Sequence, residues 1–379
     1  MKKIKFFKYI CIYLLLVPCF VEILLVVGVK AGLIEFKSIF IPPYMRQSNA
    51  QLVNDSSGSP IYINGLKWYG YGQAHYYREY DAKGFLTGDF QRIFNGKPNF
   101  FVLGDSNTEG LQVEREETFA DLIDRRLADT NVINLSVGGT GTYAQSLRYK
   151  TIRALAKVDH VLLFFLPQND VADNHYVFHK GGGLPNMPYI NSPKDLKSNL
   201  HKKDSLLRDI VKNLITARIL YVGVKNYLNI YVTSASSKKI ENSIFYRNSL
   251  FYYDVFNEPK NQIWQEARKY TEDSILDLKK MTEEDEAEFT IVLTADALQI
   301  HHYKNHLNGF DFVYPNIRMA NFCEKYEIRC IDSLPYFKKF LNENNLSPPY
   351  FSFDNDGHYT KLGHSVMADF LLQELFNNT

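Results

Sequence analysis

The sequence is poor in cysteine and has no excess of charge of either sign. Among its 379 residues there are four cysteines, too few for a disulfide-dense scaffold, and no CxxC or zinc-type spacing occurs. Lys plus Arg number 43 and Asp plus Glu 42, so no basic surface for nucleic acid is expected. With 45% hydrophobic residues, wholesale disorder is excluded and a buried core is expected. The length suits one large domain, or one domain with insertions.

The four cysteines lie in two settings. Cys11 and Cys19 fall in an apolar N-terminal run, whereas Cys323 and Cys330 lie at the end of a predicted helix and the start of a predicted strand. A bridge between Cys323 and Cys330 requires a domain outside the cytoplasm. The alternative is that both are small buried thiols.

An apolar run follows a basic start. The run YICIYLLLVPCFVEILLVVGV begins at Tyr9, and four lysines precede it: Lys2, Lys3, Lys5 and Lys8. About twenty apolar residues are enough for a membrane-spanning helix, and lysines upstream favour a cytoplasmic N-terminus. We therefore expect a signal anchor over 9–29, a cytoplasmic segment over 1–8, and a catalytic domain in the periplasm or outside the cell. The alternative is a cleaved signal peptide.

A carboxylate, Glu22, lies within this run. At the centre of a bilayer a carboxylate costs roughly 2.5–3.5 kcal/mol on insertion scales. Glu22 is therefore a candidate for pairing with a partner helix. The alternative is that it lies toward the outer interface, or is protonated.

Strand and helix patterns alternate from residue 99 onward, after a turn-rich region over 30–98 that we expect to pack on the catalytic domain. Short apolar runs predict strands, and apolar residues at helical spacing predict helices. The strands are expected over 99–104, 132–137, 160–166, 289–295 and 328–332, and the helices over 118–127, 142–157, 261–283, 314–325 and 363–376. The stretch 171–260 interrupts the pattern and is interpreted as an insertion with one helix over 204–230.

This alternation predicts a three-layer α/β/α sandwich with a five-stranded parallel sheet over 99–379. The run HVLLFFL at 160–166 is continuously apolar, as expected when helices cover both faces of a sheet. Ligands of such sheets bind beyond the carboxyl ends of the strands. The ends of the first three strands are therefore the place to expect chemistry.

Each of these three ends carries a polar group or a glycine. Ser106 follows the first strand in GDSNTEG, and a serine hydroxyl becomes a nucleophile when a base takes its proton. Gly139 follows the second strand in GGTGTY, where its backbone N–H can approach a ligand. Asn169 follows the third in PQND and offers a fixed side-chain donor to an oxyanion. Taken singly, each has a structural alternative: a turn cap, a plain turn, or an Asx-turn.

A histidine near the C-terminus supplies the matching base. His358 lies in DNDGHYTKLGH, just before the last predicted helix and two residues after Asp356. A catalytic imidazole needs an acceptor at its second ring nitrogen, which fixes the tautomer and supports the imidazolium. Asp356 can provide it through a tight turn at Gly357, and Asp354 is the alternative. A surface or structural role is the alternative for His358 itself.

The ordered set GDS, N-x-S-V-G-G, ND and D-G-H-x-x-x-x-G-H resembles the SGNH hydrolases, or GDSL-type esterases. The resemblance covers roughly residues 99–379, and no motif aligns the stretch 171–260. It implies a flavodoxin-like fold and a Ser-His-Asp triad of Ser106, His358 and Asp356. It also implies Gly139, Asn169 and the N–H of Ser106 as oxyanion donors, and no cofactor or metal.

Two departures from the family pattern bear on the site. The third block usually reads G-x-N-D, whereas Pro167 and Gln168 precede Asn169 here, and proline fixes the backbone that aims the donor. The last block is often D-x-x-H, whereas Asp356 and His358 give D-x-H. The shorter spacing is similar to that of membrane-associated alginate O-acetyltransferase relatives and favours a glycan-modifying role.

Three functions follow as hypotheses. The first is an extracytoplasmic esterase that cleaves an acyl ester of a carbohydrate or lipid. The second is an O-acyltransferase acting on a cell-surface glycan, supplied by a membrane partner that contacts Glu22. The third is an inactive anchored binding module, which intact Ser106, Asn169, Asp356 and His358 argue against.

Two histidine clusters require a metal alternative. His302 and His306 lie four residues apart with His301 adjacent, and His175 and His179 show the same spacing. Such pairs bind metal when both face one side of a helix. No glutamate lies between them as in HExxH, so a polar helix surface or a patch lining the mouth of the site is expected instead.

Overall fold

The computed structural model describes a large part of the chain. The described residues are 2–31, 33–34, 52–54, 60–62, 67–71, 75–81, 83–86, 88–167, 169–175, 206, 210, 213–221, 223–224, 255–258, 262–302, 310–346, 351–352 and 357–376.

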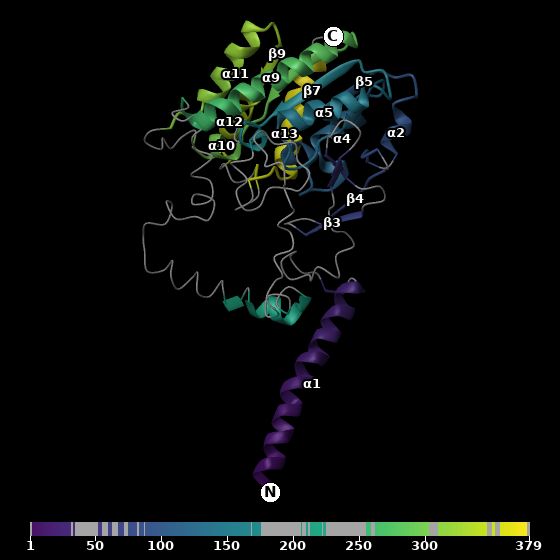
Figure 1. The fold of residues 1–379 in the computed structure, drawn as a ribbon, viewed down its shortest axis with the longest axis vertical. Helices are drawn as coiled ribbons and strands as arrows, with labels where there is room; N and C mark the ends of the chain where they lie inside the picture. The colour runs from purple at the N-terminus through teal and green to yellow at the C-terminus, as the bar shows by residue number, and fades with distance from the viewer. Residues whose placement is uncertain are drawn as a thin grey trace.

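The centre of the molecule is a five-stranded parallel sheet (Figure 1). Its strands are β5 (Asn99–Leu103), β6 (Asn131–Asn134), β7 (His160–Phe165), β8 (Glu288–Leu293) and β9 (Arg329–Asp332). They pair in the order β6-β5-β7-β8-β9, every neighbour parallel. Counted along the chain, this is the flavodoxin-like order 2-1-3-4-5. The predicted fold class is therefore confirmed.

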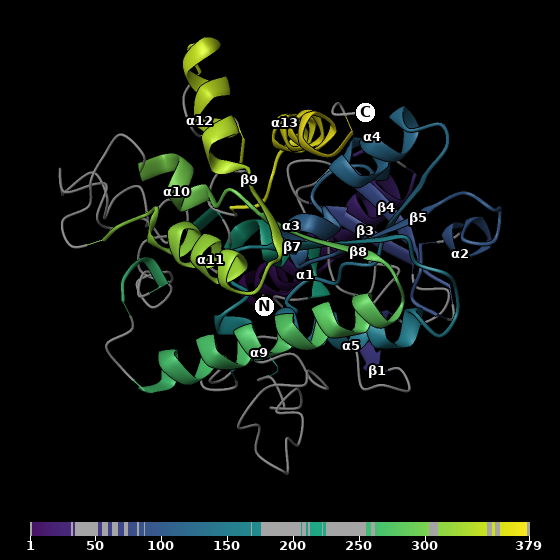
Figure 2. The same ribbon diagram turned by 90° about the horizontal axis from the view of Figure 1, so that it is seen from above.

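Helices cover both faces of this sheet (Figure 2). One face carries α5 (Thr142–Ile152), α9 (Gln262–Glu284) and α11 (Tyr314–Lys325); the other carries α4 (Phe119–Arg126), α12 (Leu334–Glu343) and α13 (Lys361–Leu371). Successive strand residues enter opposite layers, because side chains alternate along a strand. Phe101 and Leu103 of β5 pack in the α9 layer, and Val102 between them packs in the α13 layer.

Helix α4 illustrates how local sequence fixes an element. The Thr118 hydroxyl accepts from the N–H of Asp121 at 3.4 Å, which caps the first turn at the predicted start. Phe119 and Ile123, four residues apart, are buried on one face. The Phe119 ring packs on that of Phe164 with centroids 4.5 Å apart. Burying such a ring contributes about 1.5–3 kcal/mol.

Shorter elements connect the layers. They are α2 (Asp89–Arg92), α3 (Ser106–Glu109), α10 (Ala297–His302), the 3-10 turns Arg115–Glu117 and Ala172–Asn174, and a π-helical turn at Leu372–Phe376. Helix α5 ends at Ile152 and not at the predicted 157. Beyond Ile152 the N–H of Leu155 returns to the Ile152 carbonyl, and the Arg153 guanidinium pairs with Asp285.

The region before the sheet contains a long helix and two hairpins. Helix α1 spans Lys2–Lys30, and the hairpins are formed by β1 (Leu52–Asn54) with β2 (Pro60–Tyr62) and by β3 (Lys67–Tyr71) with β4 (His75–Glu79). Figure 1 shows α1 projecting away from the sheet. Across the residues that the structure describes, none of the helices has both the length and the apolar character for crossing a membrane.

Glu22 of α1 has partners within the chain. Its carboxylate accepts from the N–H of Ile215 at 2.7 Å, and from the N–H and hydroxyl of Thr216 at 2.9 and 2.8 Å. These two residues begin a helical stretch over 215–221, whose free N–H groups attract negative charge. Glu22 thus contacts a segment of its own chain, and its pairing with a partner helix stays a prediction.

The first residues of the predicted insertion, directly after β7, are held by two helices of the α9 layer. The side-chain amide of Asn174 donates to the Thr142 hydroxyl of α5 at 3.1 Å and to the Thr271 hydroxyl of α9 at 2.8 Å. The chain returns at Val255 and Phe256, which are both buried in the α9 layer. Most of the predicted helix over 204–230 lies outside the described residues.

The two cysteines near β9 are not bridged. Cys323 is buried and Cys330 half-buried, and both are free thiols. The alternative of two small thiols is therefore the one observed. The hydrogen bond between the two sulfur atoms and, after it, burial raise the pKa of the Cys330 thiol far above its usual value, so Cys330 stays protonated.

Candidate active site

Ser106 lies where β5 turns sharply into α3. Asp105 caps this helical turn, because its carboxylate accepts from the N–H of Asn107 at 2.9 Å. The turn leaves no room for a side chain at Gly104: a Cβ placed there would lie 2.3 Å from the Thr108 hydroxyl oxygen. Ser106 is the first residue of this helical turn, so its backbone N–H lies at the helix N-terminus.

His358 lies against Ser106 although the two are far apart in sequence. Its Nε2 is 2.7 Å from Oγ of Ser106. The preceding Gly357 adopts a φ of 82°, the left-handed region that favours glycine. The turn that would bring Asp356 to His358 stays a prediction, because Asp356 lies outside the described residues. The arrangement allows the imidazole to take the hydroxyl proton directly.

Two contacts of Tyr359 hold the histidine loop in place. Its backbone N–H donates to Oδ1 of Asn107 at 3.1 Å, which ties the loop to the Ser106 turn. Its hydroxyl donates to the Ala295 carbonyl at 2.6 Å, beyond the end of β8. The Tyr359 ring stacks on Phe337 with centroids 5.4 Å apart. Tyr359 thus ties the backbone next to His358 to the segments that follow β5 and β8.

The donors expected at the second and third strand ends lie at this same edge of the sheet. Gly139 has a φ of 74°, and Asn169 donates its side-chain amide to Asp105 at 3.0 Å. Within the described parts of the chain, the N–H groups of Ser106 and Gly139 have no acceptor. These two backbone N–H groups and the second amide hydrogen of Asn169 are hydrogen-bond donors of the kind that form an oxyanion hole.

The solvent-facing groups at this edge are the predicted ones. Ser106, Gly139, Asn169 and His358 are each half-buried, whereas the residues on either side of Ser106 are buried. One hydroxyl, one imidazole and the candidate donors are thus partly exposed at this edge of the sheet, next to buried residues.

Buried carboxyl groups lie next to these site residues. Burial raises the pKa of Asp105, and the nearby His358 pulls that pKa back down. Burial and the neighbouring Asp105 raise the pKa of Asp170 well above its usual value, although Asp170 accepts from the N–H of Leu166 at 2.6 Å. Burial raises the pKa of Asp296 to about 7. A positive charge on His358 therefore has the Asp105 carboxylate as a nearby counter-charge.

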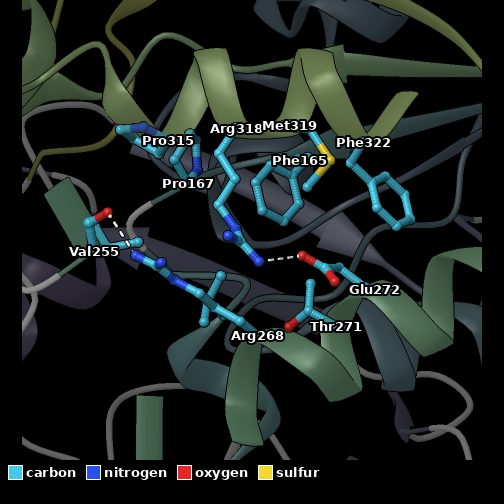
Figure 3. Close-up of a pocket in the computed structure, with 11 residues that line it drawn as sticks. Phe165, Pro167, Val255, Arg268, Thr271, Glu272, Pro315, Arg318, Met319 and Phe322 are labelled. Atoms are coloured by element: carbon cyan, nitrogen blue, oxygen red, sulfur yellow. Dashed lines mark hydrogen bonds and ion pairs between the residues drawn. The ribbon is translucent and has the colours of Figure 1, made fainter. Parts of the chain in front are cut away.

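A separate cavity with about 30 Å³ of room lies beyond the end of β7 (Figure 3). Phe165, Pro167 and Met319 form part of its apolar wall. Its arginines are already paired: Arg318 with Glu272 at 2.6 Å, and Arg268 with the Val255 carbonyl at 3.2 Å. None of the predicted site residues lines it. The space suffices for a water molecule.

Several sequence expectations fall outside the described residues. Asp356 and its alternative Asp354 do so, as do His179 and His306. His301 and His302 are in α10, and His175 is buried with its Nε2 3.7 Å from Glu266. Among the described residues, no group of three His, Cys, Asp or Glu side chains is placed to hold a metal ion.

Sequence reasoning missed three residues that shape the site: Asn107, Glu109 and Tyr359. Asn107 joins the nucleophile turn to the histidine loop, and the Glu109 carboxylate accepts from the backbone N–H of Gly138 at 2.7 Å. The first two lie within GDSNTEG, so the motif contained them. Their partners are remote in sequence, and no local pattern reveals such contacts.

The chain is similar to known proteins in structure but not in sequence. No model of a known protein family matches the chain, and no curated protein matches its sequence. A lipolytic protein of the G-D-S-L family from Veillonella parvula is 12% identical over 74% of this chain and 98% of its own, with a TM-score of 0.38. An acetyl xylan esterase is 14% identical over 73% of this chain and 100% of its own, with a TM-score of 0.43. A GDSL-like lipase from Bacteroides thetaiotaomicron is 13% identical over 73% and 86%, with a TM-score of 0.37.

Proposed function

We propose that this chain is a serine esterase in which Ser106 attacks an acyl ester and His358 acts as its base. The observation that carries the proposal is the 2.7 Å approach of His358 Nε2 to Ser106 Oγ. A serine hydroxyl alone is a weak nucleophile, and an adjacent imidazole is the common means of activating it. The half-buried setting of both side chains leaves them open to a substrate.

The reaction proceeds in two acyl-transfer steps. His358 takes the Ser106 proton while Oγ bonds to the ester carbonyl carbon, and the carbonyl oxygen becomes an oxyanion. The N–H groups of Ser106 and Gly139 and the amide of Asn169 stabilise that charge. The alcohol leaves with the proton from His358. Water, activated by His358, then releases the acid from Ser106.

The orientation of His358 is assigned to Asp356, as the resemblance implies, and Asp356 remains a prediction. Asp105 adds negative charge near the imidazole, since His358 lowers the pKa of Asp105 and the attraction between opposite charges is mutual. Burial is the largest influence and raises the pKa of Asp105, while its two backbone hydrogen bonds and the donation from Asn169 favour the ionised form and limit that rise. A fixed carboxylate close to the imidazolium lowers the energy of the proton-transfer step.

A fluorophosphonate probe tests the nucleophile. The wild-type chain should be labelled and should hydrolyse p-nitrophenyl acetate, whereas Ser106→Ala should lose both properties. Ser136→Ala is the control, because Ser136 is a buried serine near the second strand end whose hydroxyl has no hydrogen-bond partner among the described residues. Labelling that survives in Ser106→Ala would disprove the assignment.

The molecule that accepts the acyl group from Ser106 distinguishes an esterase from an O-acyltransferase. Both use the same residues, and the outcome depends on whether the site excludes water while holding a sugar hydroxyl. Incubating the acylated chain with a polysaccharide acceptor separates them: free acid in the medium supports the esterase, and acyl groups on the glycan support the transferase.

Anchoring through residues 9–29, with the catalytic domain outside the cytoplasm, is part of the proposal. Carbonate extraction of membranes and protease access to intact cells test it. Recovery of the chain in the carbonate supernatant would rule out an uncleaved anchor.

A further inference from the structure

Glu109 is a buried carboxylate that the proposed reaction does not use. It is the last residue of α3, one turn beyond Ser106, and its side chain is almost fully enclosed at 5% exposure. Oε2 accepts from the N–H of Gly138 at 2.7 Å, and Oε1 accepts from the hydroxyl of Tyr80 at 2.8 Å. Both carboxylate oxygens are therefore engaged by donors from other segments of the chain.

The Gly138 contact joins two parts of the candidate site. A Cβ placed on Gly138 would lie 3.0 Å from Oε2 of Glu109 and 3.3 Å from Cβ of Ser106. The backbone at Gly138 thus sits against both the carboxylate and the nucleophile. A side chain at this position would require the Glu109 carboxylate or Ser106 to move by a few tenths of an ångström. The segment that follows β6 therefore packs against the segment that follows β5 at Gly138.

The neighbouring residue, Gly139, carries the proposed oxyanion donor. The Gly138 N–H is held by Glu109, whereas the Gly139 N–H has no acceptor in the described part of the chain. With a φ of 74°, Gly139 turns the backbone immediately after the held peptide. A short hydrogen bond to a charged group is roughly twice as strong as a neutral one. Fixing Gly138 therefore fixes the direction of the next N–H.

We propose that Glu109 is a positioning residue that clamps the Gly138–Gly139 turn against Ser106 and so keeps the Gly139 N–H aimed at the oxyanion. This inference rests on the proposed esterase function. A displacement of about 1 Å in such a donor can cost on the order of 100-fold in rate. Glu109 acts through Gly139 and does not touch the substrate.

Three variants of the full chain test the clamp. Glu109→Ala removes both acceptors and should lower kcat roughly 10–100-fold with little change in KM, because the donor acts on the transition state. Glu109→Gln keeps one oxygen for Gly138 and can donate to the Tyr80 oxygen, so it should restore most of the loss. Tyr80→Phe leaves the Gly138 bond intact and should stay close to wild type in kcat.

Amide hydrogen exchange gives a readout that needs no activity. The Gly138 N–H should exchange faster in Glu109→Ala than in the wild type, and should keep its protection in Tyr80→Phe. An Ala variant that does not fold leaves Glu109→Gln, in which a weakened neutral bond should still speed exchange at Gly138. Unchanged exchange together with unchanged kcat in the Glu109 variants would overturn the clamp.

The failure of the clamp is distinct from the failure of the esterase assignment. A wild-type chain that hydrolyses p-nitrophenyl acetate while the Glu109 variants match it refutes the clamp alone. A wild-type chain with no hydrolysis and no probe labelling refutes the esterase assignment, and with it the catalytic purpose of the clamp, even where exchange at Gly138 responds to Glu109.

Discussion

The side-chain amide of Asn169 donates to the carboxylate of Asp105 at 3.0 Å, so the ends of β7 and β5 are joined one residue away from Ser106. One amide hydrogen is used by this bond, and the second is left to face a substrate. The bond also fixes the Asn169 side chain despite Pro167 in its block. The departure from the family pattern at Pro167 therefore leaves Asn169 at the site.

Asn169→Ala should lower kcat by about 10²–10³-fold, the usual cost of one oxyanion donor. KM should change little, because the charge develops only in the transition state. Steady-state kinetics with p-nitrophenyl acetate measure this. Asn344→Ala is the control, since Asn344 is exposed at the end of α12 and should behave as wild type. Equal kcat for the two variants would remove Asn169 from the oxyanion hole.

Gly104→Ala should destabilise the chain and displace α3. The new Cβ would lie 2.3 Å from Oγ1 and 2.7 Å from Cβ of Thr108, a contact that requires backbone movement. Overpacking of this kind costs about 1–3 kcal/mol. Urea unfolding measures the loss. Gly223→Ala is the matched control, because no atom lies within 4 Å of its added Cβ and stability should be retained.

Asp296→Asn should flatten the dependence of stability on pH between about 4 and 7. Burial raises the pKa of Asp296 from 3.8 to about 7, so in this window the folded chain holds a proton that the unfolded chain has released. Stability therefore falls as pH rises through the window, on the order of 4 kcal/mol for a shift of this size. Asparagine keeps an acceptor for the Leu298 N–H and does not titrate. Unfolding midpoints at pH 4.5 and 7.5 compare the variants; identical pH dependence contradicts the prediction.

His160 should act in the opposite direction over much of the same range. Burial lowers its pKa from 6.5 to about 4, and its Nε2 lies 2.9 Å from the Thr290 hydroxyl. The unfolded chain then binds more protons than the folded chain between these values, so stability is lost as pH falls below 6.5. His160→Gln should reduce this loss by roughly 1–3 kcal/mol at pH 4. Denaturant titrations at pH 4 and 7 check the sign, and a larger loss in the variant would refute it.

The arrangement of the sheet was predictable because each strand is marked by its own composition. The run 160–166 is apolar throughout, and β7 is buried at every position from His160 to Phe165. Helix α12 was not predicted. It begins at Leu334 with a proline in its first turn, and its apolar face, Phe337 and Leu341, is interpretable only once α13 lies beside it.

The site was predictable to the extent that its residues follow strand ends. Ser106, Gly139 and Asn169 each follow a strand, and parallel strands place their carboxyl ends at one edge. The supports were not predictable. Glu109 meets Tyr80 and Gly138, each 29 residues away, and Asn107 meets Tyr359 at a separation of 252 residues. Such pairings depend on the finished fold.

The sequence separation of 252 between Ser106 and His358 also has a consequence for biosynthesis. At about 5–20 residues per second, a ribosome adds the imidazole on the order of 10–50 seconds after the hydroxyl. Throughout that interval the emerging polypeptide carries a serine with no base beside it. Under the proposed mechanism, a chain terminated before His358 would lack the base for Ser106 and should be inactive.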